Sequence, residues 1–392
     1  MHWRRRLEQW RRRLPTWGGR KLWQAWRRRW PRQHLPAART LERWVAQAQL
    51  SGPRRQRRRR GPVTVPAGRR LALAPNDVWT VDFKGRFRHD GEWLDKPALE
   101  KANAAHASMT SAWELTDGFY ALKTNLELSR AKHLLRYCTR YRLLCYSQFC
   151  LDMGLHWPAG KLPLYMTTVR KEYDEVSTKL SSSYRKGTEF GSYLYVEKRP
   201  LGPLVACLEK PWADKLYKLA PEYVLQGMNH ELTHQLLFES LRWNEGSNRR
   251  EANFWAAEGI ASYMEAWFWS EGGWQYMPMK GYPQTELGHQ AISRCKQARN
   301  ALEKLKPLAA FVAESYPEFD QAAELSYAQS AALAQFLLDA KGPVCRSKFL
   351  ALLVEVHTCH DDASSFKKFF KDDDLGKLHS EFIAYLEGLK ED

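Results

Sequence analysis

The sequence predicts an α+β fold that follows a basic N-terminal segment. Between residues 110 and 210, short apolar runs of strand length alternate with longer amphipathic stretches, and from residue 221 onward the pattern is mainly helical. The charge balance changes near residue 88: residues 1–88 hold 25 Lys and Arg against four acidic residues, and residues 89–392 hold 36 against 40. We therefore expect an arm over residues 1–88 and a domain over residues 89–392.

Arginine runs interleaved with tryptophan mark the arm. Trp3, Trp10 and Trp17 lie seven residues apart, so they can share one helix face, although Pro15 interrupts it. Residues 35–50 predict a short helix. The arm is expected to be helical or disordered, with a solvated arginine linker after this helix.

The domain is expected to begin with a half that alternates strands and helices. The expected elements are two strands within 113–126, a helix over 128–150, a strand over 162–168, a helix over 171–180, strands over 192–196 and 204–208, and mainly helices from 221 onward. This order of elements is typical of the α+β class.

The sequence argues against a membrane-spanning protein and against a conventionally secreted one. With 44% hydrophobic residues the domain can bury a full core, yet no apolar run approaches the roughly 18 to 20 residues that span a bilayer. No apolar segment follows the N-terminal arginines, and the seven cysteines form no CxxC pair. We expect reduced thiols and a cytoplasmic location.

Residues 230–234 read His-Glu-Leu-Thr-His and predict a metal site. On a helix that starts near Pro221, His230 and His234 lie one turn apart and can bind one ion together. Glu231 lies about 100° around the helix from the first histidine. That places Glu231 beside the metal, where a general base belongs.

A catalytic metal of this type needs a third protein ligand and an open position. Glu258 follows the motif by 24 residues, which is enough for a loop and a returning helix. Gly259 is expected to let that helix approach the motif helix closely. Glu239 is a poorer candidate, because it lies one residue beyond a full turn from the motif, and Glu251 and Glu265 remain possible substitutes.

The two motif segments resemble those of the gluzincin metallopeptidases. The segments are 230–237, His-Glu-Leu-Thr-His-Gln-Leu-Leu, and 255–265, Trp-Ala-Ala-Glu-Gly-Ile-Ala-Ser-Tyr-Met-Glu. They look more similar still to an uncharacterised peptidase-MA-like bacterial family, common in planctomycetes, which also shows a segment similar to 325–331. The resemblance covers roughly residues 110 to 390, and it is specific in the two motif segments.

This resemblance implies a zincin-like metallopeptidase domain, in which a small mixed sheet and an active-site helix precede a mainly helical half. It implies Zn²⁺ as the cofactor, held by His230, His234 and Glu258, with Glu231 as the general base. Gluzincins often place a tyrosine some distance after the third ligand, which makes Tyr327 the candidate oxyanion stabiliser. His289 is the alternative, and a plain core tyrosine is equally open.

We therefore expect a zinc-dependent hydrolase, specifically a peptidase that cleaves amide bonds of a peptide or protein with metal-activated water. The alternative is a catalytically idle zincin-like fold joined to a DNA-binding arm. We expect a cytoplasmic protein, and the alternative is that the ancestral peptidase domain was exported.

The arm carries a second resemblance. Residues 15–50 look like the helix-turn-helix region of integrase-core (DDE) transposases, and residues 74–85 look like the first strand of their catalytic core. Asp82 then matches the first catalytic carboxylate, but the resemblance stops near Arg88. Because such enzymes use further carboxylates to hold two Mg²⁺ ions, we expect no transposition. Two interpretations of the truncated segment stay open: residues 1–88 bind nucleic acid, or they form a disordered, solvated basic tail.

Overall fold

The structure, a computed structural model, is described for part of the chain: residues 2–13, 19–29, 35–47, 87–89, 92–181, 191–194, 201–208, 221–241, 253–270, 273–280, 293–358, 360–362, 364–371 and 373–390. Contacts divide the chain into two compact units, Met1–Ala104 and Ala105–Asp392. The predicted arginine linker, the strand that would hold Asp82, and the alternatives Glu251 and His289 lie outside the described residues.

The first unit contains three packed helices, α1 (His2–Arg13), α2 (Gly19–Arg29) and α3 (Ala38–Gln47), then the hairpin β1 (Phe87–His89) and β2 (Glu92–Leu94) and helix α4 (Lys96–Ala105). Their shared core includes Trp10, Trp26 and Leu41, all at most 1% exposed. The Trp10 and Trp26 rings meet edge to face at 6.0 Å. The sequence left helix and disorder open for the arm; in its described part, residues 2–13, 19–29 and 38–47 are helical, and residues 87–88 belong to β1.

A five-stranded mixed sheet lies at the start of the second unit. Its strands are β3 (Trp113–Thr116), β4 (Tyr120–Thr124), β5 (Leu162–Thr167), β6 (Gly191–Tyr193) and β7 (Leu204–Cys207), in the order β3-β4-β5-β7-β6. The central strands β4, β5 and β7 are parallel, and β3 and β6 pair antiparallel at the two edges. The predicted α+β class is confirmed, with each expected strand of this half in place.

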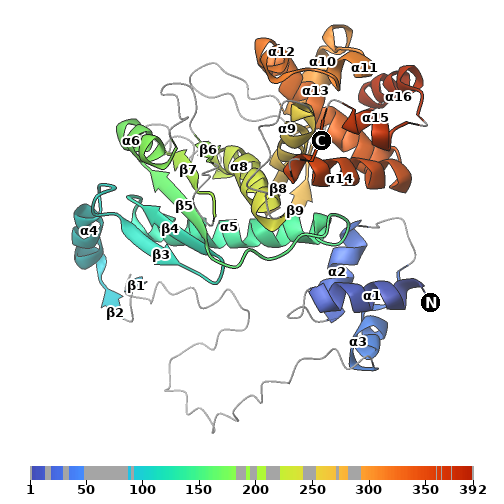
Figure 1. Ribbon diagram of the computed structural model, residues 1–392. Helices are drawn as coiled ribbons and strands as arrows, with labels where there is room; N and C mark the ends of the chain where they lie inside the picture. The colour runs from blue at the N-terminus through green and yellow to red at the C-terminus, as the bar shows by residue number, and fades with distance from the viewer. Residues whose placement is uncertain are drawn as a thin grey trace. The chain divides into compact units, whose positions relative to one another are not determined.

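Helices cover both faces of this sheet (Figure 1). Helix α6 (Arg170–Leu180) packs on one face, where Tyr173 joins Val205 and Cys207 in a buried cluster. Helix α8 (Pro221–Leu241) lies against the other face beside α5 (Leu128–Phe149). The buried hydroxyls of Tyr137 and Tyr141 donate to the side chain and backbone oxygens of Asn229, each at 2.8 Å, and so fix α8 along α5.

Among the residues that the structure describes, the C-terminal half is mainly helical and contains one hairpin. Its elements are α9 (Phe254–Glu265), β8 (Trp267–Ser270), β9 (Gly273–Tyr276), α10 (Arg294–Asn300), the 3₁₀ turn Leu302–Lys304, α11 (Leu308–Phe311), α12 (Tyr316–Gln321), α13 (Ala323–Gln335), the π turn Phe336–Ala340, α14 (Pro343–His357), α15 (Ser365–Phe369) and α16 (Leu375–Glu387). The hairpin departs from the helical expectation. Aromatic residues dominate it, and they favour strands when half their surface is buried.

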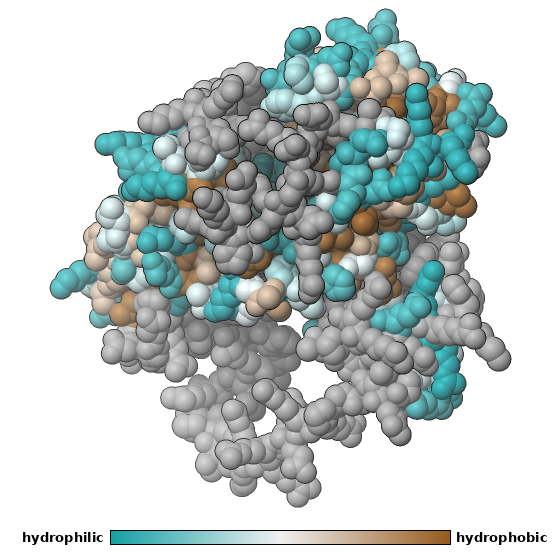
Figure 2. All heavy atoms as spheres, viewed as in Figure 1, coloured by the Kyte–Doolittle hydropathy of each residue, from teal (hydrophilic) through white to brown (hydrophobic). Residues whose placement is uncertain are grey.

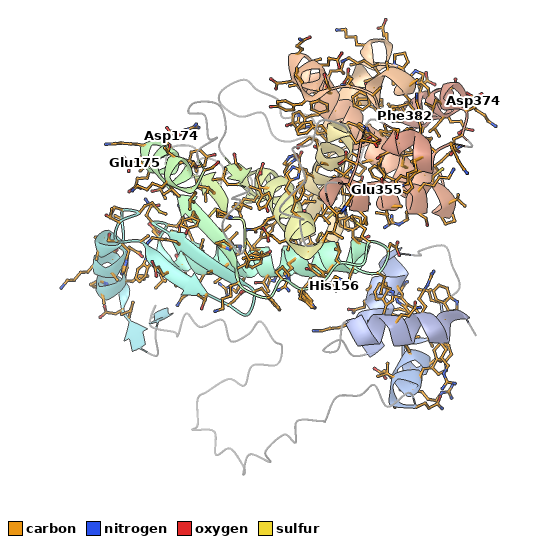
Figure 3. The ribbon with its side chains drawn as sticks, viewed as in Figure 1. His156, Asp174, Glu175, Glu355, Asp374 and Phe382 are labelled. Carbon is orange, nitrogen blue, oxygen red and sulfur yellow. The ribbon has the colours of Figure 1, made fainter. Side chains whose placement is uncertain are left out.

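Polar side chains cover much of the outer helices on the face shown in Figure 2, and apolar side chains show between them. The largest fully buried side chains are aromatic, Trp255, Tyr141 and Phe349 among them. Asp174 and Glu175 on α6 and Asp374 at the start of α16 are among the outer charged residues, whereas Phe382 on α16 is buried (Figure 3). In the ranges given above, no helix is long and apolar enough to cross a membrane.

Candidate metal centre

Helix α8 presents its two motif histidines toward α9. Their Nε2 atoms lie 3.1 Å apart, and the ring planes are inclined by 75°. The one-turn spacing expected from the sequence therefore brings both imidazole nitrogens to one point.

Glu258 on α9 completes the group. Its Oε2 atom lies 3.0 Å from Nε2 of His230 and 3.4 Å from Nε2 of His234. Asn253 precedes α9 in the left-handed region, at φ 53°, and its amide donates to the Asp362 carbonyl oxygen at 2.8 Å. Helix α9 begins directly after this residue, and its Glu258 side chain faces the two histidines of α8.

Gly259 permits a close helix contact, but the partner differs from the expected one. A Cβ at Gly259 would lie 2.7 Å from the backbone oxygen of Ser330 on α13. The close approach is therefore between α9 and α13, and the expected approach to the motif helix is wrong at this residue. The reason is packing: α9 is held between α8 and α13, so it faces each of them with a different side.

His230, His234 and Glu258 form a group that could hold a metal ion, with all their ligand atoms within 4.8 Å of one another. Two ligand atoms about 2.1 Å from an ion at the tetrahedral angle are about 3.4 Å apart. The observed separations of 3.0, 3.1 and 3.4 Å fit such an ion. The side chains are also well shielded, at 12%, 8% and 6% exposure.

The charges of this group depend on one another. Burial lowers the pKa of His230, but hydrogen bonds to Glu258 and Glu265 outweigh it and raise the pKa well above its usual value. Burial raises the pKa of Glu258, but the neighbouring charge of His234 and the hydrogen bond with His230 bring it well below its usual value. The site therefore favours a carboxylate that faces positive charge, which a cation can supply.

Glu265, expected as a substitute ligand, lies behind His230. Its Oε1 atom accepts from Nδ1 of His230 at 2.7 Å, on the ring edge opposite the metal-facing nitrogen. Its other oxygen lies 3.9 Å from Nε of Arg294 on α10. A carboxylate in this place fixes the ring orientation and the tautomer of a histidine ligand.

Replacing Glu265 with Ala should therefore lower zinc affinity by about 10- to 100-fold, because His230 would lose the partner of Nδ1. Glu265→Gln retains an acceptor oxygen and should lose less. Competition with a zinc-binding dye measures both variants. Equal affinity in the alanine variant and the wild type would refute this role of Glu265.

Glu231 and Glu239 point from α8 toward the edge of the sheet. Oε2 of Glu231 accepts the backbone N–H of Tyr193 on β6 at 2.7 Å. Oε1 of Glu239 accepts the Tyr193 hydroxyl at 2.7 Å and the Gly202 N–H at 2.6 Å. Burial raises the pKa of Glu239, and the two hydrogen bonds oppose that rise. Glu239 thus lies apart from the histidine group.

Tyr327 on α13 lies beside the group. Its ring centroid is 6.2 Å from that of His230, and the Arg294 guanidinium lies over it at 5.2 Å. Burial raises the Tyr327 pKa, and the negative charges of Glu258 and Glu231 raise it further. The phenol consequently keeps its proton and stays a hydrogen-bond donor near both carboxylates.

Sequence reasoning missed the roles of Tyr193 and Arg294. The position of Glu265, seven residues or two turns after Glu258, was a usable signal, because residues two turns apart share a helix face. Tyr193 and Arg294 carry no such local signal, since tertiary packing alone brings them to α8 and α9.

Comparison with known proteins adds no relative: no family model and no curated protein matches this chain.

Proposed function

We propose that the second unit is a zinc-dependent peptidase with a zincin-like fold of the gluzincin type. The observation that carries the proposal is the convergence of His230, His234 and Glu258 to separations that suit one ion. Glu231 supports it, because a general base is needed near the metal: Glu231 follows His230 directly in the sequence, and its charge acts on Tyr327 as that of Glu258 does.

Zinc fits the donor set better than the hard cations do. Two imidazole nitrogens and one carboxylate oxygen are the ligands of many catalytic zinc sites, whereas Mg²⁺ and Ca²⁺ prefer oxygen ligands throughout. Bound zinc would supply Lewis acidity toward a scissile carbonyl and a water molecule.

The chain's own residues would supply the remaining functions. Glu231 takes a proton from the attacking water and passes it to the leaving amine. The N–H of Tyr193 holds one oxygen of that carboxylate and so fixes its orientation. Tyr327 donates a hydrogen bond to the developing oxyanion, in keeping with its raised pKa.

A digestion experiment tests the proposal. The full chain is incubated with denatured proteins in the presence of zinc, and new peptide termini are identified by mass spectrometry. We expect cleavage with zinc, loss of cleavage after chelation and recovery on adding zinc back. Cleavage that persists in the chelator, or none under any of these conditions, would overturn the proposal.

Tyr327→Phe should lower kcat by about 10²- to 10³-fold with little change in KM, the usual effect of removing one oxyanion donor. Tyr316→Phe is the matched control, because Tyr316 is a half-exposed tyrosine on the neighbouring helix α12. Steady-state kinetics of both variants test this prediction. An unchanged kcat in Tyr327→Phe would show that Tyr327 is a core residue without a part in catalysis.

Nucleic-acid binding by the first unit is a second candidate function, and it is the alternative if the metal centre is idle. The excess of Lys and Arg in residues 1–88 favours it, and Arg4, Lys21 and Arg27 lie on the exposed surface of α1 and α2. The buried Trp10 and Trp26 cannot stack on bases, so binding would depend on phosphate contacts. The likeness of residues 1–88 to a truncated transposase start remains part of this proposal.

Salt dependence tests the second candidate. Four phosphate contacts would reduce the affinity of the full chain for duplex DNA about 100-fold between 50 and 200 mM salt, roughly the effect of counterion release. Fluorescence anisotropy measures the binding. No binding at the lower salt concentration would leave a solvated basic arm.

A further inference from the structure

The edge strand β6 is connected to α8 through one residue that bonds two carboxylates. The Tyr193 backbone N–H donates to Glu231, and its hydroxyl donates to Glu239, both at 2.7 Å. Glu231 and Glu239 lie eight residues apart on α8, or about 12 Å along the helix axis. Tyr193 therefore joins the proposed general base to a second carboxylate two turns away.

Gly202 provides the space in which the phenol and the second carboxylate meet. A Cβ at this position would lie 2.7 Å from the Tyr193 hydroxyl and 2.9 Å from Oε1 of Glu239. The Gly202 N–H donates to the same oxygen at 2.6 Å. Position 202 therefore has no room for a residue larger than glycine while Tyr193 and Glu239 keep this arrangement.

Strand β6 is short where the structure describes it. It has three residues and, among the described strands, lies at the edge of the sheet beside β7. The Tyr193 ring also stacks on Phe238 of α8, with centroids 5.8 Å apart. The phenol–carboxylate bond is thus a main polar connection between this strand and the helix.

We infer that Tyr193 and Glu239 are positioning residues for Glu231. The bond between the phenol and Glu239 holds β6 at the height along α8 where the Tyr193 N–H meets the Glu231 carboxylate. This inference rests on the proposed function, since Glu231 acts as general base only there. It assigns a task to Glu239, which the histidine group does not use.

Tyr193→Phe removes the hydroxyl and keeps the ring on Phe238, and Glu239→Ala removes its acceptor. Each should lower kcat about tenfold, with KM and zinc affinity unchanged, because a small displacement of a catalytic group slows the reaction without weakening binding. Glu239→Gln keeps an oxygen that can accept both donors and should restore the wild-type kcat.

Tyr146→Phe is the matched control. Its buried hydroxyl bonds to Ser240 on α8 and to the backbone oxygen of His156, and neither of these bonds involves β6. It should leave kcat unchanged. A similar fall in kcat in Tyr146→Phe, or full activity in both Tyr193→Phe and Glu239→Ala, would overturn the inference.

Hydrogen–deuterium exchange separates this inference from the proposed function. The backbone amide of residue 193 should exchange about tenfold faster in Tyr193→Phe and Glu239→Ala than in the wild type, because its hydrogen bond to Glu231 opens more often. In Glu239→Gln and Tyr146→Phe it should exchange at the wild-type rate. An inactive wild type with this exchange pattern would refute the peptidase and keep the connection. Unchanged exchange in every variant would refute the connection itself, whatever the activity.

Discussion

Replacing Glu231 with Gln is expected to remove nearly all peptide hydrolysis while zinc binding stays at one ion per chain. The amide cannot take a proton from water, so the loss should be about 10³-fold, within the range of general-base catalysis. It can still accept the Tyr193 N–H, so the local structure should persist. Steady-state kinetics and metal analysis of the same sample measure the two effects together.

Glu175→Gln serves as the matched control, because it makes the same chemical change on the exposed face of α6, away from the motif helix (Figure 3). It should retain wild-type kinetics. If Glu231→Gln remains as active as this control, Glu231 is not the general base.

The double substitution His230→Ala/His234→Ala should remove the stabilisation that zinc gives to the fold. A ligand that binds only the folded chain contributes about 2.7 kcal/mol at a concentration 100 times its Kd. Added zinc should therefore raise the unfolding temperature of the wild type and leave that of the double variant unchanged. The variant should also be less stable without metal, since Glu258 would lose both of its buried partners.

His133→Ala is the control for this comparison. His133 lies exposed on α5, where partial desolvation and then the nearby Arg136 and Arg140 lower its pKa, and it belongs to no metal-binding group among the described residues. Zinc should stabilise this variant as it stabilises the wild type. An equal response to zinc in the double-histidine variant would show that the ion binds elsewhere.

Local patterns were sufficient to predict the strands and helices between residues 113 and 208 and the mainly helical character of the rest of the second unit. The apolar pattern in 113–124 and the long amphipathic stretch after Leu128 depend on neighbours in sequence, and the two strands and the helix formed where expected. The hairpin after α9 was not predicted, because its aromatic residues suit a buried helix and a strand equally well until their partners are known. For the arm, composition could not separate packed helices from disorder.

The metal group shows the same division. His230 and His234 share a helix face whatever surrounds them, so their proximity followed from the motif alone. Glu265 was weighed as a ligand but lies behind His230, because only the crossing of α8 and α9 decides which ring edge each carboxylate meets. Gly259 lies against α13 and not α8 because the packing of α9 between these two helices decides which face each of them contacts.

The most direct test is native mass spectrometry of the full chain after equilibration with zinc and removal of excess metal, beside the His230→Ala/His234→Ala variant. We predict one zinc ion on the wild-type chain and none on the variant. A wild type without bound metal, or a variant that carries as much zinc as the wild type, would contradict the metal centre.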